Sequence, residues 1–470
     1  MKKGLFLFFL AIVLSLSLHA QDRFNCVDLS LNNVAEVRCV PCDTNGFCIV
    51  RTQPLGDSLK QHFEVYDTRM QPLRDTFLRV GSQYSISLCN FENDEVAVLL
   101  KREISKKSSS YTSILFNIAD KRLIARNIVD SQPVKDINNL HHFSGNLIFS
   151  TTDFNGGDMV WFLPAGVDVA KSFDFNSKYK MKVLDAVSES ETGTFAFCVA
   201  ADGKTFFFKT DPHGNTKFAK ISEESSTSAS LLKVHNGNYI LVFNELKDDA
   251  LAVRSALISD AGVEKQSTFS FVREATGRVI EETGDPVFGR ALTSSPRNTA
   301  FSPVSCFKGD KMLAAVVDIY VPEYRQHYNG HFYDTRFYGF RHQYAGVLFY
   351  DTNGRQVKYM KVPFNDTQMI HSGAYAKTKA AFLEDGGILL YFMDSDGLTT
   401  QLMDSSFVVV DPARSSEIPL RSRMYKKRNA EVDVFESWYG KNYFLLSAVQ
   451  FSTERKNSMV GYIVNKLKFK

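Results

Sequence analysis

The segment from Tyr324 to His342 holds the densest group of side chains that could bind a ligand. It mixes aromatic rings with arginines and histidines in two runs, one before and one after Asp334-Thr335. Aromatic rings stack on sugar rings and on cations, and arginine donates paired hydrogen bonds to carboxylate, sulfate or phosphate. The composition predicts a ligand-binding segment whose candidate residues are Tyr324, Arg325, Tyr328, His331, Tyr333, Arg336, Tyr338, Arg341 and His342.

The same segment leaves two other interpretations open. Its aromatic rings could pack it onto the rest of the fold instead of facing a ligand. His327 and His331 have the four-residue spacing of a metal pair on a helix, but Asn329-Gly330 between them is typical of a turn. We therefore predict no metal site and no cofactor.

Positive charge gathers in two further segments that we expect near this one. A locally basic, aromatic surface favours an anionic ligand, although each segment taken alone is also consistent with a solvated run of charge. The whole chain has 55 Lys and Arg against 52 Asp and Glu, a balance that argues against a general nucleic-acid binder. The basic residues are Lys101, Arg102, Lys106 and Lys107 in one segment and Arg421, Arg423, Lys426, Lys427 and Arg428 in the other, of which Lys426 joins the candidate site.

Four of the seven cysteines, Cys26, Cys39, Cys42 and Cys48, lie near the start of the chain. In an oxidising compartment such a group predicts disulfides near the N-terminus. The spacing of Cys39 and Cys42 is that of a thioredoxin-type redox motif, but a turn from Asp43 to Gly46 follows instead of the helix that this chemistry needs. A structural disulfide is the favoured interpretation, with a four-cysteine zinc site as a third alternative.

Residues 1–20 have the features of an export signal. Met1-Lys2-Lys3 is cationic, Leu5 to Leu18 is an apolar run too short to span a membrane, and Leu18-His19-Ala20 suits signal peptidase. We expect cleavage after Ala20 and no lipid anchor, because Cys26 lies well past that point. No later stretch reaches the roughly 18 apolar residues of a membrane helix. The prediction is an exported protein that is periplasmic, at the cell surface or secreted.

The elements that must position these residues are strands. Short apolar runs rich in β-branched and aromatic residues recur between turn residues, and helical periodicity is nearly absent. Because the runs do not alternate with polar residues, we expect sheets that are covered on both faces. The clearest runs are Val96 to Leu100, Tyr239 to Phe243, Met312 to Val317, Gly387 to Phe392 and Phe407 to Val410.

One unit repeats along the chain: an apolar strand, a turn with Asp, Asn or Gly, and a more polar strand. Its turns recur every 45 to 60 residues, apart from one gap of 91. Four strands in a unit of this size resemble a β-propeller blade, although no WD ladder, Kelch diglycine or sialidase box is present. We predict an all-β propeller of about eight blades, with seven blades or tandem β-sandwich domains as alternatives. The turns of the successive units lie at positions 67, 120, 165, 211, 260, 351 and 411, which we call the turn marks.

The chain ends predict how the propeller closes. The last strand, Val460 to Val464, matches the third strand of an eighth unit, and Phe24 to Leu31 is a spare strand at the other end. Pairing the two would complete the final sheet and remove an exposed edge. We expect one propeller domain over residues 21–470, with insertions near 273–297 and 321–342. The resemblance to propellers implies that both insertions lie on one face.

Two functions from different classes are compatible with these features. The first is a binding module that holds an anionic glycan or a partner protein of the envelope or exterior. The second is a carbohydrate-active enzyme similar in outline to propeller polysaccharide lyases, with Tyr328, His331, Arg336 and His342 as candidate catalytic groups. We favour the binding module, because no acid and base spacing stands out and an aromatic loop alone does not make a catalyst.

Overall fold

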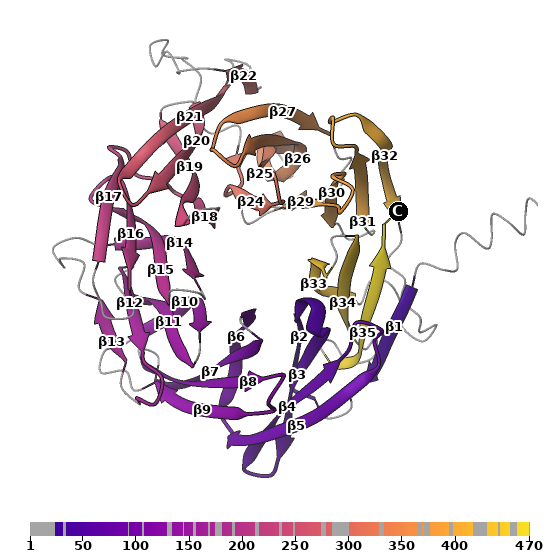
Figure 1. Ribbon diagram of the computed structural model, residues 1–470. Coiled ribbons are helices and arrows are strands. Elements are labelled where there is room, and N and C mark those ends of the chain that lie inside the picture. Colours follow the sequence, from indigo (N-terminus) through magenta and orange to yellow (C-terminus); the bar gives the residue numbers. More distant parts are fainter. Residues whose placement is uncertain are drawn as a thin grey trace, which may run out of the picture. The chain divides into compact units, whose positions relative to one another are not determined.

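The protein has the all-β fold predicted for it, an eight-bladed β-propeller. In the computed structural model, the described strands form eight antiparallel sheets (Figure 1). In six of these sheets each strand pairs with the next one in sequence, and the exceptions are the sheet that joins the two ends of the chain and the six-stranded sheet. Tandem β-sandwiches and a seven-bladed propeller are thereby excluded. The structure describes residues 24–469 except 32–33, 93, 106–107, 129–133, 144, 154–156, 168–169, 174–180, 190–192, 212–215, 235–236, 248–249, 274–278, 284–299, 329–332, 364–368, 371–376, 394–397, 417–429, 440–441 and 452–457.

The chain divides into two compact units, of which the first joins the two ends of the sequence. Unit 1 consists of Met1–Asp130 and Pro419–Lys470, and unit 2 of Ser131–Ile418. The prediction of a single domain over residues 21–470 stays a prediction. Within the described ranges, no helix is both long enough and apolar enough to cross a membrane.

Unit 1 holds three sheets, β2-β3-β4-β5, β6-β7-β8-β9 and β1-β35-β34-β33. One short 3-10 helix, η1 (Asp43–Asn45), connects β2 to β3. The strands are β1 (Phe24–Ser30), β2 (Glu36–Pro41), β3 (Phe47–Leu55), β4 (Ser58–Tyr66), β5 (Pro72–Gly81), β6 (Tyr84–Glu92), β7 (Glu95–Ser105), β8 (Ser108–Asn117), β9 (Leu123–Ile128), β33 (Ala430–Trp438), β34 (Tyr443–Phe451) and β35 (Met459–Lys468).

Unit 2 holds five sheets. Three have four strands, β10 to β13, β14 to β17 and β29 to β32; β18 to β22 form a sheet of five, and β23 to β28 one of six. The strands are β10 (Val134–Phe143), β11 (Asn146–Asp153), β12 (Asp158–Leu163), β13 (Lys171–Phe173), β14 (Met181–Glu189), β15 (Thr194–Ala201), β16 (Lys204–Thr210), β17 (Thr216–Ser222), β18 (Ala229–Lys233), β19 (Tyr239–Lys247), β20 (Ala250–Ser259), β21 (Gly262–Arg273), β22 (Val279–Thr283), β23 (Ala300–Phe301), β24 (Ser305–Lys308), β25 (Met312–Tyr328), β26 (Tyr333–Asp351), β27 (Gln356–Val362), β28 (Met369–Ile370), β29 (Thr378–Phe382), β30 (Ile388–Met393), β31 (Leu398–Met403) and β32 (Val409–Ser416).

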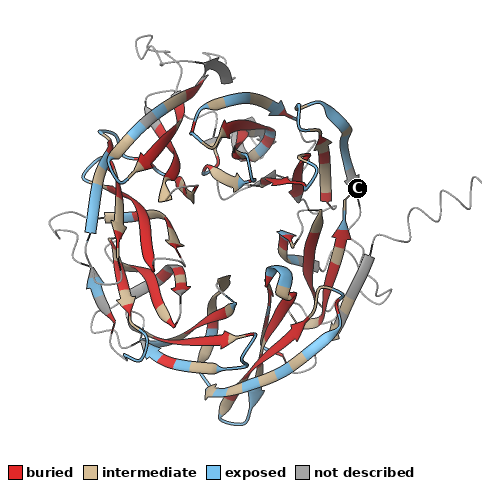
Figure 2. Cartoon of the chain, viewed as in Figure 1, coloured by how far each residue is buried: buried red, intermediate tan, exposed pale blue. Residues whose placement is uncertain are grey.

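Burial changes systematically across a sheet, from the second strand to the fourth (Figure 2). In β15 seven consecutive residues are buried, whereas most of β17, the fourth strand of the same sheet, is exposed. The second strands are covered on both faces because neighbouring sheets pack against them, as the runs without alternation predict. The apolar clusters accordingly combine residues of two adjacent sheets, for example β14 to β17 with β18 to β20.

The N-terminal strand completes the last sheet of unit 1, as predicted. β1 pairs with β35 in antiparallel register, with Phe24 opposite Leu467 and Ser30 opposite Gly461. β35 therefore has hydrogen-bonded neighbours on both sides, β1 and β34. Residues from the two ends of the sequence meet again where the Trp438 indole donates a hydrogen bond to the carbonyl of Gly46, 2.9 Å away.

Carboxylates connect successive sheets at their first strands. Asp433 of β33 accepts a hydrogen bond from the backbone N–H of Cys39 in β2 at 3.1 Å, and Asp185 of β14 accepts one from Leu231 in β18 at 2.7 Å. Both acids stand at or beside a bulge in their strand, between Val432 and Val434 and just after Val183. A bulge re-aims a side chain and interrupts the ladder, which leaves the carboxylate free to bind the next sheet.

Two predictions about individual segments were wrong. The turn mark at 411 lies inside β32, and the turn is at 404–408, where the Asp404 carboxylate accepts hydrogen bonds from the backbone N–H groups of Ser406 and Val408. The insertion at 321–342 was expected to be a loop without strong structure, but strand pairing continues through it as far as Tyr328 opposite Tyr333. β25 and β26 thus form one long hairpin, which we call the hairpin arm from Val321 to His342.

Candidate functional site

A cavity of about 340 Å³ lies between two adjacent sheets of unit 2 and is a candidate binding site. One wall comes from β16 and β17, and the other from β19 and the turn that joins β20 to β21. This volume is at the lower end of the range for ligand sites, enough for one side chain or one small group. We call it the inter-sheet pocket; its lining residues are Phe207, Lys209, Lys217, Phe218, Ala219, Tyr239, Ile258, Ser259, Asp260, Ala261 and Gly262.

Strand periodicity explains which residues of β16 and β17 face the pocket. Phe207 lies opposite Ala219 in the ladder and Lys209 lies opposite Lys217, so these four side chains share one face of the sheet. On that face the Phe207 ring packs against the Tyr239 ring at 5.3 Å. The floor of the pocket is therefore apolar and aromatic, and its lysines lie toward one end of the two strands.

A carboxylate of the β20–β21 turn joins the two lysines at the mouth of the pocket. The Asp260 carboxylate lies 3.5 Å from the Lys209 ammonium and 3.4 Å from the Lys217 ammonium. These neighbours, Lys209 first, lower the pKa of Asp260, so this acid is ionised at neutral pH. Lys217 and Asp260 are both about two-thirds exposed, which leaves this ion pair accessible to a ligand from solvent.

A second, buried carboxylate lies deeper, next to Lys209. Glu189 accepts a hydrogen bond from the Tyr239 hydroxyl and lies 3.9 Å from Lys209 and 3.8 Å from Lys233. Burial, and then the contact with Glu189, raises the pKa of Tyr239. The phenol therefore stays protonated and binds Glu189 as a donor, which does not suit a general base.

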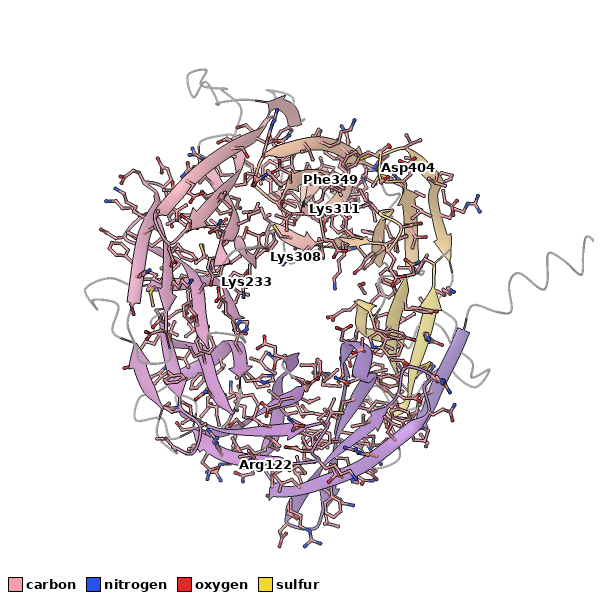
Figure 3. All side chains as sticks on the ribbon, in the orientation of Figure 1. Arg122, Lys233, Lys308, Lys311, Phe349 and Asp404 are labelled. Carbon is pink, nitrogen blue, oxygen red and sulfur yellow. The ribbon has the colours of Figure 1, made fainter. Side chains whose placement is uncertain are left out.

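The charges around the pocket leave an excess of positive charge. Lys308 donates a 2.5 Å hydrogen bond to the carbonyl of Lys233, and Figure 3 shows the two lysines on neighbouring first strands. Burial, and then the nearby Lys233, lowers the pKa of Lys308. Asp310 also acts on Lys308, so the wider neighbourhood holds four lysines and three carboxylates, Asp260, Glu189 and Asp310. The lining itself carries two lysines, Lys209 and Lys217, against the single carboxylate of Asp260. The arrangement can attract and hold an anionic group.

None of the residues predicted from the sequence is in this pocket's lining, and those that the structure describes lie on the hairpin arm. Tyr328 is exposed at its end. Arg341 is exposed and forms an ion pair with Glu323 at 2.8 Å. The backbone register places Tyr324 opposite Phe337 and Arg325 opposite Arg336. The side chains of Tyr324, Arg325, Tyr333, Arg336 and Tyr338, and the whole of His331 and Lys426, lie outside the described residues.

His342 is the one predicted residue that the structure places in the interior. Its side chain is fully buried, and its Nε2 lies 2.7 Å from an equally buried carboxylate oxygen of Asp318. The rings of Tyr320 and Phe392 pack against the imidazole, each at 5.3 Å. Asp318 also accepts the backbone N–H of Thr378 at 2.9 Å, from the next sheet. His342 thus supports the base of the hairpin arm and has no face toward solvent.

The predicted disulfide is not found among the described cysteines. Cys39, Cys42 and Cys48 are free thiols. Strand alternation separates them: Cys39 packs with Trp438 on one face of the hairpin, while Cys42 and Cys48 pack on the other. Burial is the main cause that raises the pKa of all three thiols. A protonated, buried thiol is a poor nucleophile, which argues against the redox interpretation of this motif. The side chain of Cys26 lies outside the described residues.

Comparison with known proteins adds no functional assignment. No protein-family model matches the chain, and no curated protein matches it. It is similar to prolyl oligopeptidase B from Galerina marginata, with 10% identity and a TM-score of 0.42 over 90% of this chain and 56% of that one. The present chain therefore spans about half the length of that protein. It is also similar to Sqt1 from Chaetomium thermophilum, with 9% identity and a TM-score of 0.45 over 95% of this chain and 98% of that one. For Sqt1 from Saccharomyces cerevisiae the identity is 12% and the TM-score 0.45, over 95% of this chain and 99% of that one. The fold assignment rests on the strand order of the eight sheets.

Proposed function

We propose that this protein is an exported, non-catalytic binding module whose inter-sheet pocket holds an acidic segment of a partner protein. The observation that supports it best is the pairing of an apolar floor, formed by Phe207 and Tyr239, with lysines at the mouth. Such a site takes an apolar side chain into the cavity while the ammonium groups of Lys209 and Lys217 contact a neighbouring carboxylate. Export rests on the predicted signal sequence in residues 1–20.

The lining favours a protein segment over a glycan. Sugar hydroxyl groups need several hydrogen-bond donors and acceptors around them, and in this lining Lys209, Lys217 and Asp260 already pair with one another. Among the lining side chains, Ser259 and Tyr239 carry the uncharged polar groups, and the Tyr239 hydroxyl already donates to Glu189. Apolar and charged side chains make up the rest, which suits an apolar residue next to Asp or Glu. The anionic glycan therefore becomes the competing outcome of the test.

The pocket chemistry favours binding over catalysis. The Lys209 ammonium forms ion pairs with two carboxylates, Asp260 at 3.5 Å and Glu189 at 3.9 Å. Tyr239 is kept protonated, as described above. A lyase or hydrolase needs an acid and a base poised near the operating pH, and these pairs are instead arranged as fixed charges.

The test is a peptide array and a glycan array probed with the same mature protein. We expect binding to peptides that place an apolar residue beside Asp or Glu. Lys217→Glu reverses one exposed charge and should weaken binding at least about fivefold, since an exposed charge contact is worth up to about 1 kcal/mol and the new carboxylate repels the acidic segment. Ala219→Trp should abolish binding by filling the cavity. Lys358→Glu makes the same charge change on an exposed fourth strand of another sheet and is the matched control.

Three results would contradict the proposal. One is binding to anionic glycans without binding to peptides. Another is equal affinity for Lys217→Glu and Lys358→Glu. The third is peptide binding that survives Ala219→Trp. The melting temperature of each variant should be measured alongside, so that a loss of binding is not caused by unfolding.

A further inference from the structure

Three side chains that can bind a metal ion converge on the first sheet of unit 1. His62 and Glu64 belong to β4 and Asp75 to β5, and their nearest ligand atoms all lie within 4.8 Å of one another. The register places Glu64 opposite Asp75, and His62 is two residues from Glu64 on the same strand. Residues two apart on a strand project from the same face, so the ladder itself brings the three together.

The separation between two of these groups matches that of two ligands on one ion. The His62 Nδ1 lies 3.2 Å from an Asp75 carboxylate oxygen. Two ligands bound tetrahedrally to zinc at about 2.0 to 2.2 Å are about 3.3 to 3.5 Å apart. An ion could thus take the place of the hydrogen bond between His62 and Asp75 with little movement of either side chain.

The surroundings provide one buried ligand and an entry path. The His62 side chain is only 5% exposed, and its Nε2 has no hydrogen-bond partner among the described residues. One ring nitrogen without a partner leaves the imidazole free to present either nitrogen to an ion. Asp75, in contrast, is 59% exposed, so an ion can approach from solvent on its side.

Arg51 is the competitor for this site. Its guanidinium forms an ion pair with Glu64, and the Tyr66 hydroxyl donates to the same carboxylate at 3.4 Å. A divalent cation bound to Glu64 would have to displace Arg51 or lie beside its charge. Arg51 therefore weakens metal binding, and its replacement should strengthen it. If the cluster binds no metal, replacing Arg51 gives no such gain.

We propose that His62, Glu64 and Asp75 bind a divalent transition metal of the zinc class, which fastens β5 to β4. One imidazole with two carboxylates suits zinc, whereas calcium and magnesium prefer oxygen ligands alone. This inference departs from the sequence-based prediction of no metal site, and it is independent of the inter-sheet pocket in unit 2. Its role would be structural, because it joins the outer strand of a sheet to its neighbour.

The test is calorimetric titration of EDTA-treated full-length protein with zinc chloride and with calcium chloride. We expect zinc to bind and calcium not to bind. Asp75→Asn and His62→Ala should each weaken zinc binding about tenfold to a hundredfold, the range typical for loss of a metal-site residue. Arg51→Gln should tighten it. Asp57→Asn removes the same charge as Asp75→Asn from the exposed β3–β4 turn of this sheet and should leave binding unchanged.

Thermal melting with and without zinc gives the second readout. Zinc should raise the melting temperature of the wild type and of Arg51→Gln, and should not raise that of Asp75→Asn, since binding to the folded state stabilises it. Equal zinc affinity in wild type, Asp75→Asn and His62→Ala would overturn the proposal, as would equal binding of calcium. An Arg51→Gln protein that binds zinc no more tightly than the wild type would also overturn it.

Discussion

Replacing Asp318 by alanine should destabilise unit 2 strongly, because this one carboxylate satisfies several buried donors. It accepts hydrogen bonds from His342 Nε2 at 2.7 Å, from the backbone N–H of Lys377 at 2.7 Å and from that of Thr378 at 2.9 Å. The Thr378 hydroxyl donates to it as well. Asp318 is fully buried in β25, and Thr378 begins β29 of the next sheet, so the loss would loosen the junction of two blades.

The magnitude follows from the donors left without a partner. A hydrogen bond to a charged group contributes about 1.5 to 3 kcal/mol, and four donors bind this carboxylate. These terms overlap, since they share one carboxylate. We expect Asp318→Ala to lower the free energy of unfolding by about 4 kcal/mol. Asp318→Asn keeps one acceptor oxygen and should cost about half as much.

The assay is urea unfolding followed by the fluorescence of a single tryptophan. The chain has two, Trp161 in β12 of unit 2 and Trp438 in β33 of unit 1, so a Trp438→Phe background leaves a reporter in unit 2. Asp202→Asn removes an equal charge from an exposed turn of unit 2 and should shift the midpoint very little. A loss below about 1 kcal/mol for Asp318→Ala, or a loss equal to that of Asp202→Asn, would refute the reasoning.

Three further predictions concern unit 1. Deleting residues 24–31 removes the strand that pairs with β35 and should leave an exposed edge that aggregates, measured by light scattering. Tyr462→Phe removes the 2.6 Å hydrogen bond to Asp433 and should cost about 1 to 3 kcal/mol in urea unfolding, whereas equal stability would count against the blade junction described here. Burial raises the pKa of Cys89 from 9.0 to about 12, so between pH 9 and 12 its thiol ionises in the unfolded chain and stays protonated in the folded one. The free energy of unfolding should therefore fall as the pH rises from 9 toward 12, and Cys89→Ala should reduce that fall.

The repeat and the closing strand could be predicted because both depend on local composition. Six of the seven turn marks coincide with the turn between the third and fourth strands or its flanking residues, where Asp or Gly is needed to reverse the chain. Phe24 to Leu31 stood out as an unpaired strand before the first unit, and β35 has room for it. The predicted turn at 411 was wrong because the sequence Val408-Val409-Val410 is typical of a buried third strand, whereas all three residues are exposed.

The inter-sheet pocket could not be predicted, because its parts are far apart in the sequence. The turns at 211 and 260, which follow the strand of Phe207 and contain Asp260, were both predicted as repeats of one unit. What brings Lys209 near Asp260 is the packing of one sheet on the next, and strand periodicity carries no information about that packing. The hairpin arm was predicted as the binding segment because its aromatic and basic residues follow one another in a single stretch of sequence.

The carboxylates that join the sheets are an intermediate case. Each of these acids follows a charged residue near the start of the first strand of its sheet. Asp185 lies three residues after Lys182, and Asp433 lies two residues after Glu431. An acid inside an apolar strand is a visible signal. Its role depends on a bulge that turns the side chain toward the next sheet, and bulges leave little trace in a single sequence.

Hydrogen exchange of the protein with its best array peptide, compared with the free protein, tests the central claim most directly. If the inter-sheet pocket is the binding site, the peptide should slow exchange in residues 204–210, 216–222 and 258–262, and Ala219→Trp should remove this protection. Protection confined to the hairpin arm at 321–342, with the pocket segments unchanged, would contradict the account and return the binding site to the arm predicted from the sequence.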